Sequence, residues 1–204
     1  MIVIGVAGGS GSGKSTFVAN LRQALGPDPV PVMPQDAYYH DQGHLELAER
    51  QKQNYDHPDA IEWTLLGEHL QRIRQGGAIV MPRYSMLTCT REAGTEELRP
   101  SAVLVVEGIL LFSDPGVRGM IDLRVFLDVS EQDRYQRIVQ RDIAERGRTE
   151  EMVRQRYEET VRPMYSDHIL PTKRYAHVLV AEGGKNLAAV DLVAATAMHM
   201  RDNP

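Results

Sequence analysis

The chain has 204 residues, of which 42% are hydrophobic and 25% are charged, and its formal net charge is -5 at pH 7. This length and composition suit one globular domain, so we expect a single domain over residues 1–204. The charge gives no support for a general nucleic-acid or membrane surface, and no stretch is typical of a signal peptide or a membrane span. The single cysteine, Cys89, excludes an internal disulfide framework and favours a reducing, cytoplasmic location.

The first predicted strand, over residues 2–7, leads into a glycine-rich loop and then a helix-forming stretch over 16–25. This context matches G-x-x-x-x-G-K-[ST], in which inward-pointing N–H groups and the helix N-terminus form a phosphate site. Lys14 is predicted to reach the β- and γ-phosphates of a nucleotide, and the Ser15 hydroxyl to bind Mg²⁺. The residues of the motif are Gly8, Gly9, Ser10, Gly11, Ser12, Gly13, Lys14 and Ser15.

The next segments alternate between strand-like and helix-like patterns. The expected elements are a short strand over 30–33, a polar and aromatic loop over 35–41, a short helix over 45–53 and a helix over 61–73. This last helix is expected to end at Gly76 and Gly77. Two short strands, over 78–81 and 84–90, are predicted to form a small hairpin excursion, about 78–99, with the segment around Leu98.

The second half of the chain completes an alternating pattern. Residues 101–106 are continuously apolar, as in a strand buried on both faces of a parallel sheet. Two later strands are expected, over 123–128 and 178–180. A helix capped by Ser130 is expected to run to about Ala144, and a long helix from Thr149 is expected to be interrupted near Pro163. A last helix, over 187–200, is expected to be capped by Asn186. The pattern predicts a three-layer α/β fold with a mainly parallel sheet and its active site at the carboxyl ends of the strands.

Two carboxylates are expected at that edge. Glu107 ends the apolar strand, where it could reach a metal ion or its water shell, although a solvated strand end would show the same pattern. Asp36 follows the second strand and is the first choice for the carboxylate that accepts a hydroxyl proton in phosphoryl transfer, with Asp41 second. The alternative for either aspartate is the capping of a turn.

Eight arginines lie between residues 134 and 162, but eight acidic residues lie between 131 and 159, which argues against a nucleic-acid surface. Arg134, Arg137 and Arg154 are therefore interpreted as solvated helix faces or intrahelical pairs. Arg146 and Arg148 differ, because Gly147 separates them at a helix break. Such a break suits a mobile lid, about 141–149, that carries cations over transferring phosphates.

Together these motifs resemble the uridine kinase (uridine-cytidine kinase) family over nearly the whole chain. Beyond the P-loop, the resemblance rests on the segments 35–39, 54–60, 107–110, 141–148, 161–164, 171–176 and 183–186. It implies a P-loop NTPase fold and Mg²⁺-dependent phosphorylation of the 5′-hydroxyl of uridine or cytidine, with ATP or GTP as the donor. It also implies a homotetramer acting in pyrimidine salvage.

The resemblance also implies roles for individual residues. Asp36 would be the general base, and Asp56 would accept hydrogen bonds from the ribose hydroxyls. Tyr55 would pack against the nucleoside, Tyr84 would contact its base, and Arg148 would reach from the lid into the acceptor site. Further residues assigned in this way are Thr16 and Arg141 for ATP binding, Arg146 for catalysis, Cys89 and Arg156 for substrate binding, and Ser15 with Glu107 for the metal. For His57, fixing the loop and contacting the substrate are equally open, and Tyr38, Tyr39 and Trp63 are interpreted as packing residues.

The chain departs from this family in the acceptor pocket. An aromatic residue is usual at the Met86 position, a base-reading histidine at the Cys89 position and an arginine at the Ile138 position. Human-type members have glutamine at the Arg156 position. We therefore expect intact phosphate-donor chemistry with altered pyrimidine recognition, either poor discrimination or a preference for cytidine.

Two other functions stay open at this point. One is a related phosphoribulokinase-type kinase that acts on another sugar or small alcohol, and the other is a nucleotide-binding regulator without turnover. The presence together of Lys14, Asp36, Glu107 and Arg148 argues against the regulator. A GTPase switch is disfavoured, because the guanine-reading sequence N-K-x-D does not occur.

Overall fold

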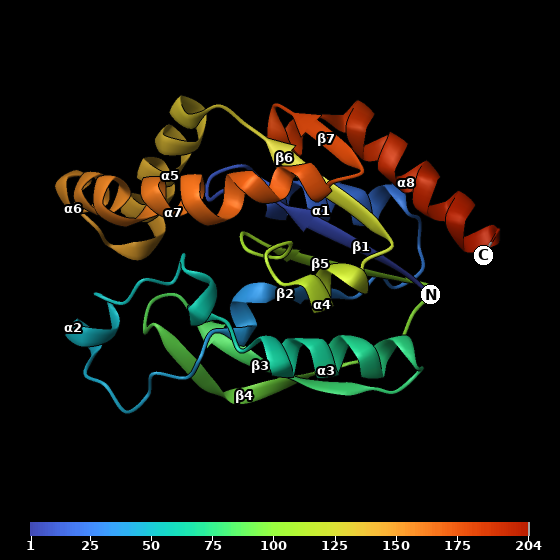
Figure 1. Ribbon diagram of the computed structural model, residues 1–204, viewed down its shortest axis with the longest axis horizontal. Helices are drawn as coiled ribbons and strands as arrows, with labels where there is room; N and C mark the ends of the chain where they lie inside the picture. Colours follow the sequence, from blue (N-terminus) through green and yellow to red (C-terminus); the bar gives the residue numbers. More distant parts are fainter. Residues whose placement is uncertain (204) are drawn as a thin grey trace.

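The computed structural model describes residues 1–203. Its centre is a parallel sheet with strand order β2-β5-β1-β6-β7, accompanied by an antiparallel hairpin, β3-β4 (Figure 1). The strands are β1 (Ile2–Ala7), β2 (Val32–Pro34), β3 (Ile79–Ser85), β4 (Thr90–Leu98), β5 (Val103–Gly108), β6 (Leu123–Asp128) and β7 (Val178–Ala181). The helices are α1 (Lys14–Ala24), α2 (Leu47–Arg50), α3 (Trp63–Arg74), α4 (Pro115–Gly119), α5 (Glu131–Arg146), α6 (Glu150–Arg156), α7 (Arg162–Met164) and α8 (Leu187–Asp202). The predicted α/β class is confirmed.

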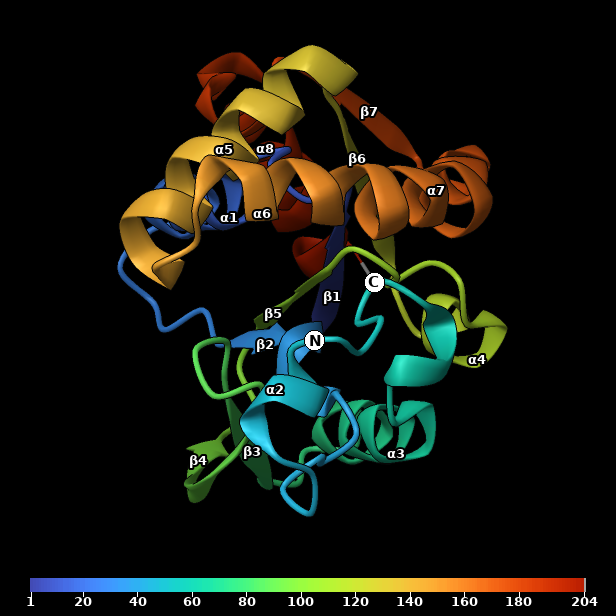
Figure 2. The same ribbon diagram turned by 90° about the vertical axis from the view of Figure 1, so that its left-hand side faces the viewer.

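Two hydrophobic cores lie on opposite faces of the sheet. On one face Ile4 packs in a cluster with Phe17 of α1 and Val193 of α8. On the other face Val3 belongs to a cluster with Leu66 of α3 and with the hairpin. Neighbouring residues of β1 thus point to opposite faces, and helices cover both sides, which gives the three predicted layers (Figure 2).

The strand register brings the functional loops to one edge of the sheet. Ala7 of β1 lies opposite Gly108 of β5, and Pro34 of β2 lies opposite Glu107. The glycine loop after β1, the end of β5 and the 3-10 turn Gln35–Tyr38 after β2 therefore lie side by side. The buried Gln35 side chain fixes this arrangement, because its Oε1 accepts a hydrogen bond of 2.9 Å from the N–H of Leu110.

The predicted helix caps are confirmed. The Ser130 side chain accepts from the N–H of Asp133 at the start of α5, and the Asn186 side chain accepts from the N–H of Ala189 at the start of α8. α5 continues two residues past the predicted end and stops at Gly147, whose φ of 64° ends the helix. Near Pro163 the following helix contains π-helical turns, Tyr157–Val161 and Tyr165–Ile169.

The predicted strand over 84–90 is wrong. β3 runs without a break from Ile79 to Ser85, the chain turns over 86–89, and β4 begins at Thr90. A register shift between Pro82 and Tyr84 explains why the sequence suggested an interruption, because proline fits a strand at such irregularities. The helix expected over 45–53 forms only over Leu47–Arg50. Among residues 1–203, no helix combines the length and the apolar character that crossing a membrane requires.

Candidate active site

The phosphate-binding loop is held against α5 and needs its glycines. Gly11 has φ of 76°, and a Cβ atom there would lie 2.4 Å from the carbonyl oxygen of Arg134. Gly13, with φ of 88°, precedes α1 and packs on the backbone of Gly184. A side chain at either position would be strained and would collide with backbone atoms. The loop therefore keeps its N–H groups in a fixed path at the start of α1.

Arg134 supports this loop, so the prediction that it lies on a solvated helix face is wrong. Its side chain is buried, its Nε donates to the carbonyl oxygen of Val129 at 3.3 Å, and its guanidinium lies 3.6 Å from the ring centroid of Tyr165. Arg137 also reaches the loop, with a bond of 3.4 Å to the carbonyl oxygen of Gly11. Arg154 behaves as predicted and pairs with Glu151 within α6.

Lys14 and Ser15 lie beside two carboxylates. The Lys14 ammonium donates to the carbonyl oxygens of Gly8 and Gly9 at 3.0 and 3.2 Å, and the Ser15 hydroxyl donates to Glu107 Oε1 at 3.4 Å. Burial lowers the pKa of Lys14, while the charges of Glu107 and Asp36 oppose that shift. Burial also raises the pKa of Glu107. A hydroxyl and a carboxylate oxygen at this spacing are the hard oxygen ligands that Mg²⁺ prefers, so the residues present fit the metal.

Asp36 faces this cation, whereas Asp41 does not. Burial raises the pKa of Asp36, and the Lys14 ammonium and the Tyr39 hydroxyl act in the opposite direction. Asp41 instead accepts hydrogen bonds from Thr90 Oγ1 at 2.6 Å and from the N–H of Gly43. It does not line the cavity that Lys14 and Asp36 line. Its carboxylate therefore ties a loop to the hairpin, and Asp36 is the stronger candidate base.

Three tyrosines form an aromatic wall on the far side of Asp36. The ring centroids of Tyr39 and Tyr84 are 5.1 Å apart, and those of Tyr39 and Tyr55 are 5.2 Å apart. Tyr55 also donates to the carbonyl oxygen of Cys89 at 3.3 Å, which links the loop after α2 to the tip of the hairpin. Tyr39 therefore lines the site, beyond the packing role that the sequence suggested.

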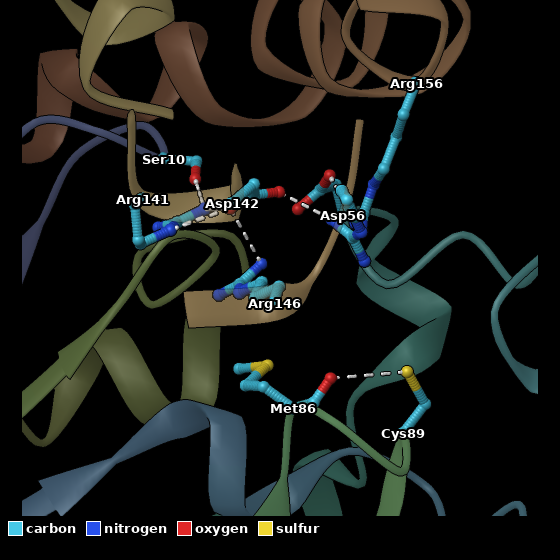
Figure 3. Close-up of polar contacts among 9 residues, drawn as sticks. Ser10, Asp56, Met86, Cys89, Arg141, Asp142, Arg146 and Arg156 are labelled. Atoms are coloured by element: carbon cyan, nitrogen blue, oxygen red, sulfur yellow. Dashed lines mark hydrogen bonds and ion pairs between the residues drawn. The ribbon is translucent and has the colours of Figure 1, made fainter. Parts of the chain in front are cut away.

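Asp56 lies buried beside this wall. Its N–H donates to Asn54 Oδ1, and its own Oδ2 has no hydrogen-bond partner among the described residues. The guanidinium of Arg156, from α6, is 3.7 Å from that oxygen (Figure 3). A buried carboxylate oxygen that faces a cavity with one cation nearby is suited to accept hydrogen bonds from a ligand hydroxyl. His57 has a structural role, since its Nδ1 accepts from the N–H of Asp59.

The lid arginines converge on one carboxylate, that of Asp142. Its Oδ1 lies 2.8 Å from Arg141 and 3.5 Å from Arg146, and its Oδ2 lies 2.5 Å from Arg148 (Figure 3). Arg141 also donates to Ser10 Oγ at 3.4 Å, which joins the lid to the phosphate loop. Burial alone would raise the pKa of Asp142, but the guanidinium groups of Arg141, Arg146 and Arg148 hold it below its usual range. Asp142 thus stays charged and orients all three arginines.

One cavity of about 290 Å³ collects most of the predicted site residues. Those that line it are Ser10, Lys14, Ser15, Asp36, Tyr55, Asp56, Tyr84, Cys89, Glu107, Arg141, Arg146, Arg148 and Arg156. Thr16 does not line it, and neither do Gly8, Gly9, Gly11, Ser12 and Gly13. The sequence missed Asp142 and Tyr39, although Asp142 directly follows Arg141 and Tyr39 lies three residues after Asp36. Their roles depend on which neighbours the fold supplies, and no spacing rule gives those.

The parallel sheet, the glycine loop at its edge and the carboxylates facing Lys14 define a P-loop kinase. A family model described as the phosphoribulokinase/uridine kinase family matches residues 3–189, and the chain belongs to this family. It is 43% identical over 203 residues to a uridine kinase of Shewanella amazonensis, with 98% of this chain and 96% of the relative covered. A uridine kinase of Vibrio atlanticus is 43% identical over 198 residues, covering 95% and 93%. The resemblance seen in the sequence is thereby confirmed.

Solved structures show the same fold. A phosphoribulokinase from Rhodobacter spheroides superposes with a TM-score of 0.66 at 20% identity, covering 88% of this chain and 69% of that chain. A protein described as a possible uridine kinase from Bacillus stearothermophilus gives 0.56 at 20% identity, covering 88% of each chain.

Replacing Asp142 with asparagine tests its role as the organiser of the lid arginines. Because the variant leaves three guanidinium groups without their shared charge, we expect Asp142→Asn to lower the free energy of unfolding by about 3 kcal/mol at neutral pH. The folded-state pKa of Asp142 is lowered, so its stabilisation is present above the unfolded value and is lost as pH falls through the folded value. Wild type and variant should therefore begin to converge as the pH falls below about 3.9, the ordinary aspartate value, and should coincide only below the lowered folded-state pKa.

Urea unfolding followed by circular dichroism over this pH range provides the measurement. Glu151→Gln is the matched control, because it breaks an exposed arginine pair on the adjacent helix and should have a much smaller effect. Equal losses in the two variants, or a gap that persists in acid, would contradict the assignment.

Proposed function

We propose that the chain transfers the γ-phosphoryl group of ATP or GTP to the 5′-hydroxyl of uridine or cytidine. The observation that carries this proposal is the arrangement of the cavity. Lys14, Ser15 and Glu107 lie at its phosphate-loop end, while Asp56 and the tyrosine wall lie at its other end. Asp36 lines the space between these two groups of side chains.

The transfer itself needs only one proton acceptor. The nucleoside O5′ attacks the γ-phosphorus, the bond from that phosphorus to the bridging oxygen of the β-phosphate breaks, and the nucleoside diphosphate leaves with the bond's electron pair. The hydroxyl proton passes to the carboxylate of Asp36, whose raised pKa favours its capture. Lys14 and the arginines oriented by Asp142 stabilise the charge on the phosphoryl oxygens.

Ser15 and Glu107 would hold Mg²⁺, which would supply positive charge that offsets the charge of the phosphates. The side chains of Arg146 and Arg148 would act from a lid over about 141–149, consistent with the break of α5 at Gly147. The family resemblance supports a homotetramer. The single cysteine and the family resemblance together support a cytoplasmic location.

The acceptor end supports a nucleoside. The free Oδ2 of Asp56 can accept hydrogen bonds from the vicinal hydroxyls of a ribose, and a base can stack on the tyrosine wall. Names of relatives at 43% identity point the same way. A kinase acting on another sugar or small alcohol has less support, since such an acceptor would leave the aromatic wall without a partner.

Asp36→Asn should lower kcat by a factor of about 10² to 10⁴, because an amide cannot accept the hydroxyl proton. ATP binding should survive, since Lys14 and the phosphate loop are unchanged. Steady-state ADP production and ATP titration by calorimetry measure the two effects. Asp41→Asn serves as the control and should keep nearly normal turnover. A normal kcat in Asp36→Asn would reject it as the base.

Lys14→Ala and Arg148→Ala should fail at different stages. Lys14 contacts phosphates in the ground state, so its loss should weaken ATP binding and abolish transfer. Arg148 acts when the lid closes, so its loss should mainly reduce transfer and acceptor binding. Equilibrium ATP binding together with single-turnover rates separates the two steps. Large, equal losses of ATP affinity with unchanged transfer per bound complex would contradict this division.

Cys89→His tests base recognition. The Cys89 thiol points to the carbonyl oxygen of Met86, with Sγ at 3.6 Å, and a thiol is a weak donor and acceptor. We therefore expect the wild type to discriminate poorly between uridine and cytidine or to favour cytidine, and histidine to shift kcat/KM toward uridine by somewhat under a factor of about ten. Measured kcat/KM values for both nucleosides decide this. Efficient use of uridine by the wild type, with both ratios unmoved in the variant, would place base recognition elsewhere.

A further inference from the structure

A second, larger groove adjoins the catalytic cavity at the tip of the hairpin. Its volume is about 640 Å³, compared with about 290 Å³ for the catalytic cavity. The residues that line both are Met86, Cys89, Arg146, Arg148 and Arg156. The rest of the groove is formed by residues of the segment 48–53, by Leu87, and by α6 with the turn after it, including Met152 and Gln155. Only a few side chains therefore separate the two spaces.

The side chains that line both spaces form a partition between them, and this partition can change shape at the tip of the hairpin. The backbone of Cys89 is fixed by the Tyr55 hydroxyl, which donates to its carbonyl oxygen, and its thiol bonds to the carbonyl oxygen of Met86. The Met86 side chain is unbranched and adopts new rotamers at low cost. On the other side of the partition, Arg148 is held by Asp142 and Arg156 lies near Asp56 (Figure 3), so both arginines border the two spaces with defined ion-pair partners.

The groove is also positively charged. Its charged lining residues are Lys52, Arg146, Arg148, Arg156 and Glu159. Arg146 and Arg148 share the carboxylate of Asp142, and Arg156 lies near Asp56, so among the described residues Lys52 is the cation of the groove that has no ion-pair partner. A surface of this kind attracts an acidic group more strongly than a neutral group of the same shape. Lys52 lies three residues before Tyr55, one of the tyrosines on which the base would stack.

We propose that this groove receives a substituent carried by the base of the acceptor, so that the enzyme phosphorylates pyrimidine nucleosides with an extended, acidic arm on the ring. This inference rests on the proposed function. The arm passes between Met86 and the lid arginines, and its carboxylate lies near Lys52. The ribose and the 5′-hydroxyl keep the positions that Asp56 and Asp36 define.

The test compares acceptors on the full-length enzyme with ATP. The acceptors are uridine and cytidine, uridine with a carboxyethyl chain at ring carbon C5, cytidine with the same chain on its exocyclic nitrogen, and the matching neutral carbamoylethyl compounds. At least one acidic-arm nucleoside should reach kcat/KM within about tenfold of its parent. The neutral compounds should be used less well than the acidic ones, with the difference mainly in KM.

Two variants in the groove locate the arm. Met152→Trp fills the groove beside the lid, and it should lower kcat/KM for the acidic-arm nucleoside by about tenfold or more while uridine is unaffected. Lys52→Glu should lower kcat/KM for the acidic arm more than for the neutral arm. Leu192→Trp, at an exposed leucine on α8 outside both cavities, is the matched control for added bulk.

The outcomes separate the two proposals. Turnover of uridine or cytidine with no turnover of any armed nucleoside would overturn the groove assignment, and so would equal use of armed nucleosides by the wild type, Met152→Trp and Lys52→Glu. No ADP production with any nucleoside would instead refute the nucleoside kinase function itself.

Discussion

The site depends on the half-buried ammonium group of Lys14, which lies near carboxylates from other strands. Lys14 follows β1, Glu107 lies in β5 and Asp36 follows β2, and the parallel register places these three chain positions at one edge. A buried lysine is costly unless opposite charges compensate it. The strand order β2-β5-β1 thus brings both compensating carboxylates to Lys14. With a different strand order the Lys14 ammonium would lack its nearby carboxylates. The strand order of the sheet therefore determines how the charge of Lys14 is compensated.

In the predicted lid the charges are reversed: one buried carboxylate, that of Asp142, holds several cations. Asp142 contacts Arg141, Arg146 and Arg148, all within a short stretch around the end of α5. Three guanidinium groups so close together would repel one another without it, and their burial would be unfavourable. With it they face the cavity in fixed orientations, a condition under which charge stabilisation of a transition state costs little reorganisation. Lys14 and the arginines around Asp142 therefore face the cavity from two clusters, each with its own compensating carboxylates.

The sequence predicted what depends on local chemistry and missed what depends on distant neighbours. The bounds of β6, the Ser130 cap and the glycine loop follow from local patterns, and the structure confirms them. The Arg134 prediction failed because charge spacing along a helix cannot reveal that Tyr165 and the phosphate loop bury the guanidinium. The hairpin turn was predicted in the wrong place because Pro82, within β3, is a residue that usually marks the end of a strand. The irregular pairing between Pro82 and Tyr84 accommodates the proline inside the strand.

The two ends of the cavity are built by different means. Under the proposed function, the donor end consists of backbone N–H groups, glycine conformations and charges at strand ends, all of which are tied to the sheet. The acceptor end consists of side chains from the loop after α2, the hairpin tip and the lid, which meet only at their extremities. A substitution at Met86 or Cys89 therefore changes the shape offered to a base without disturbing the register of β1, β2 and β5. This separation allows the donor chemistry to stay intact while the acceptor end departs from the usual pattern of the family.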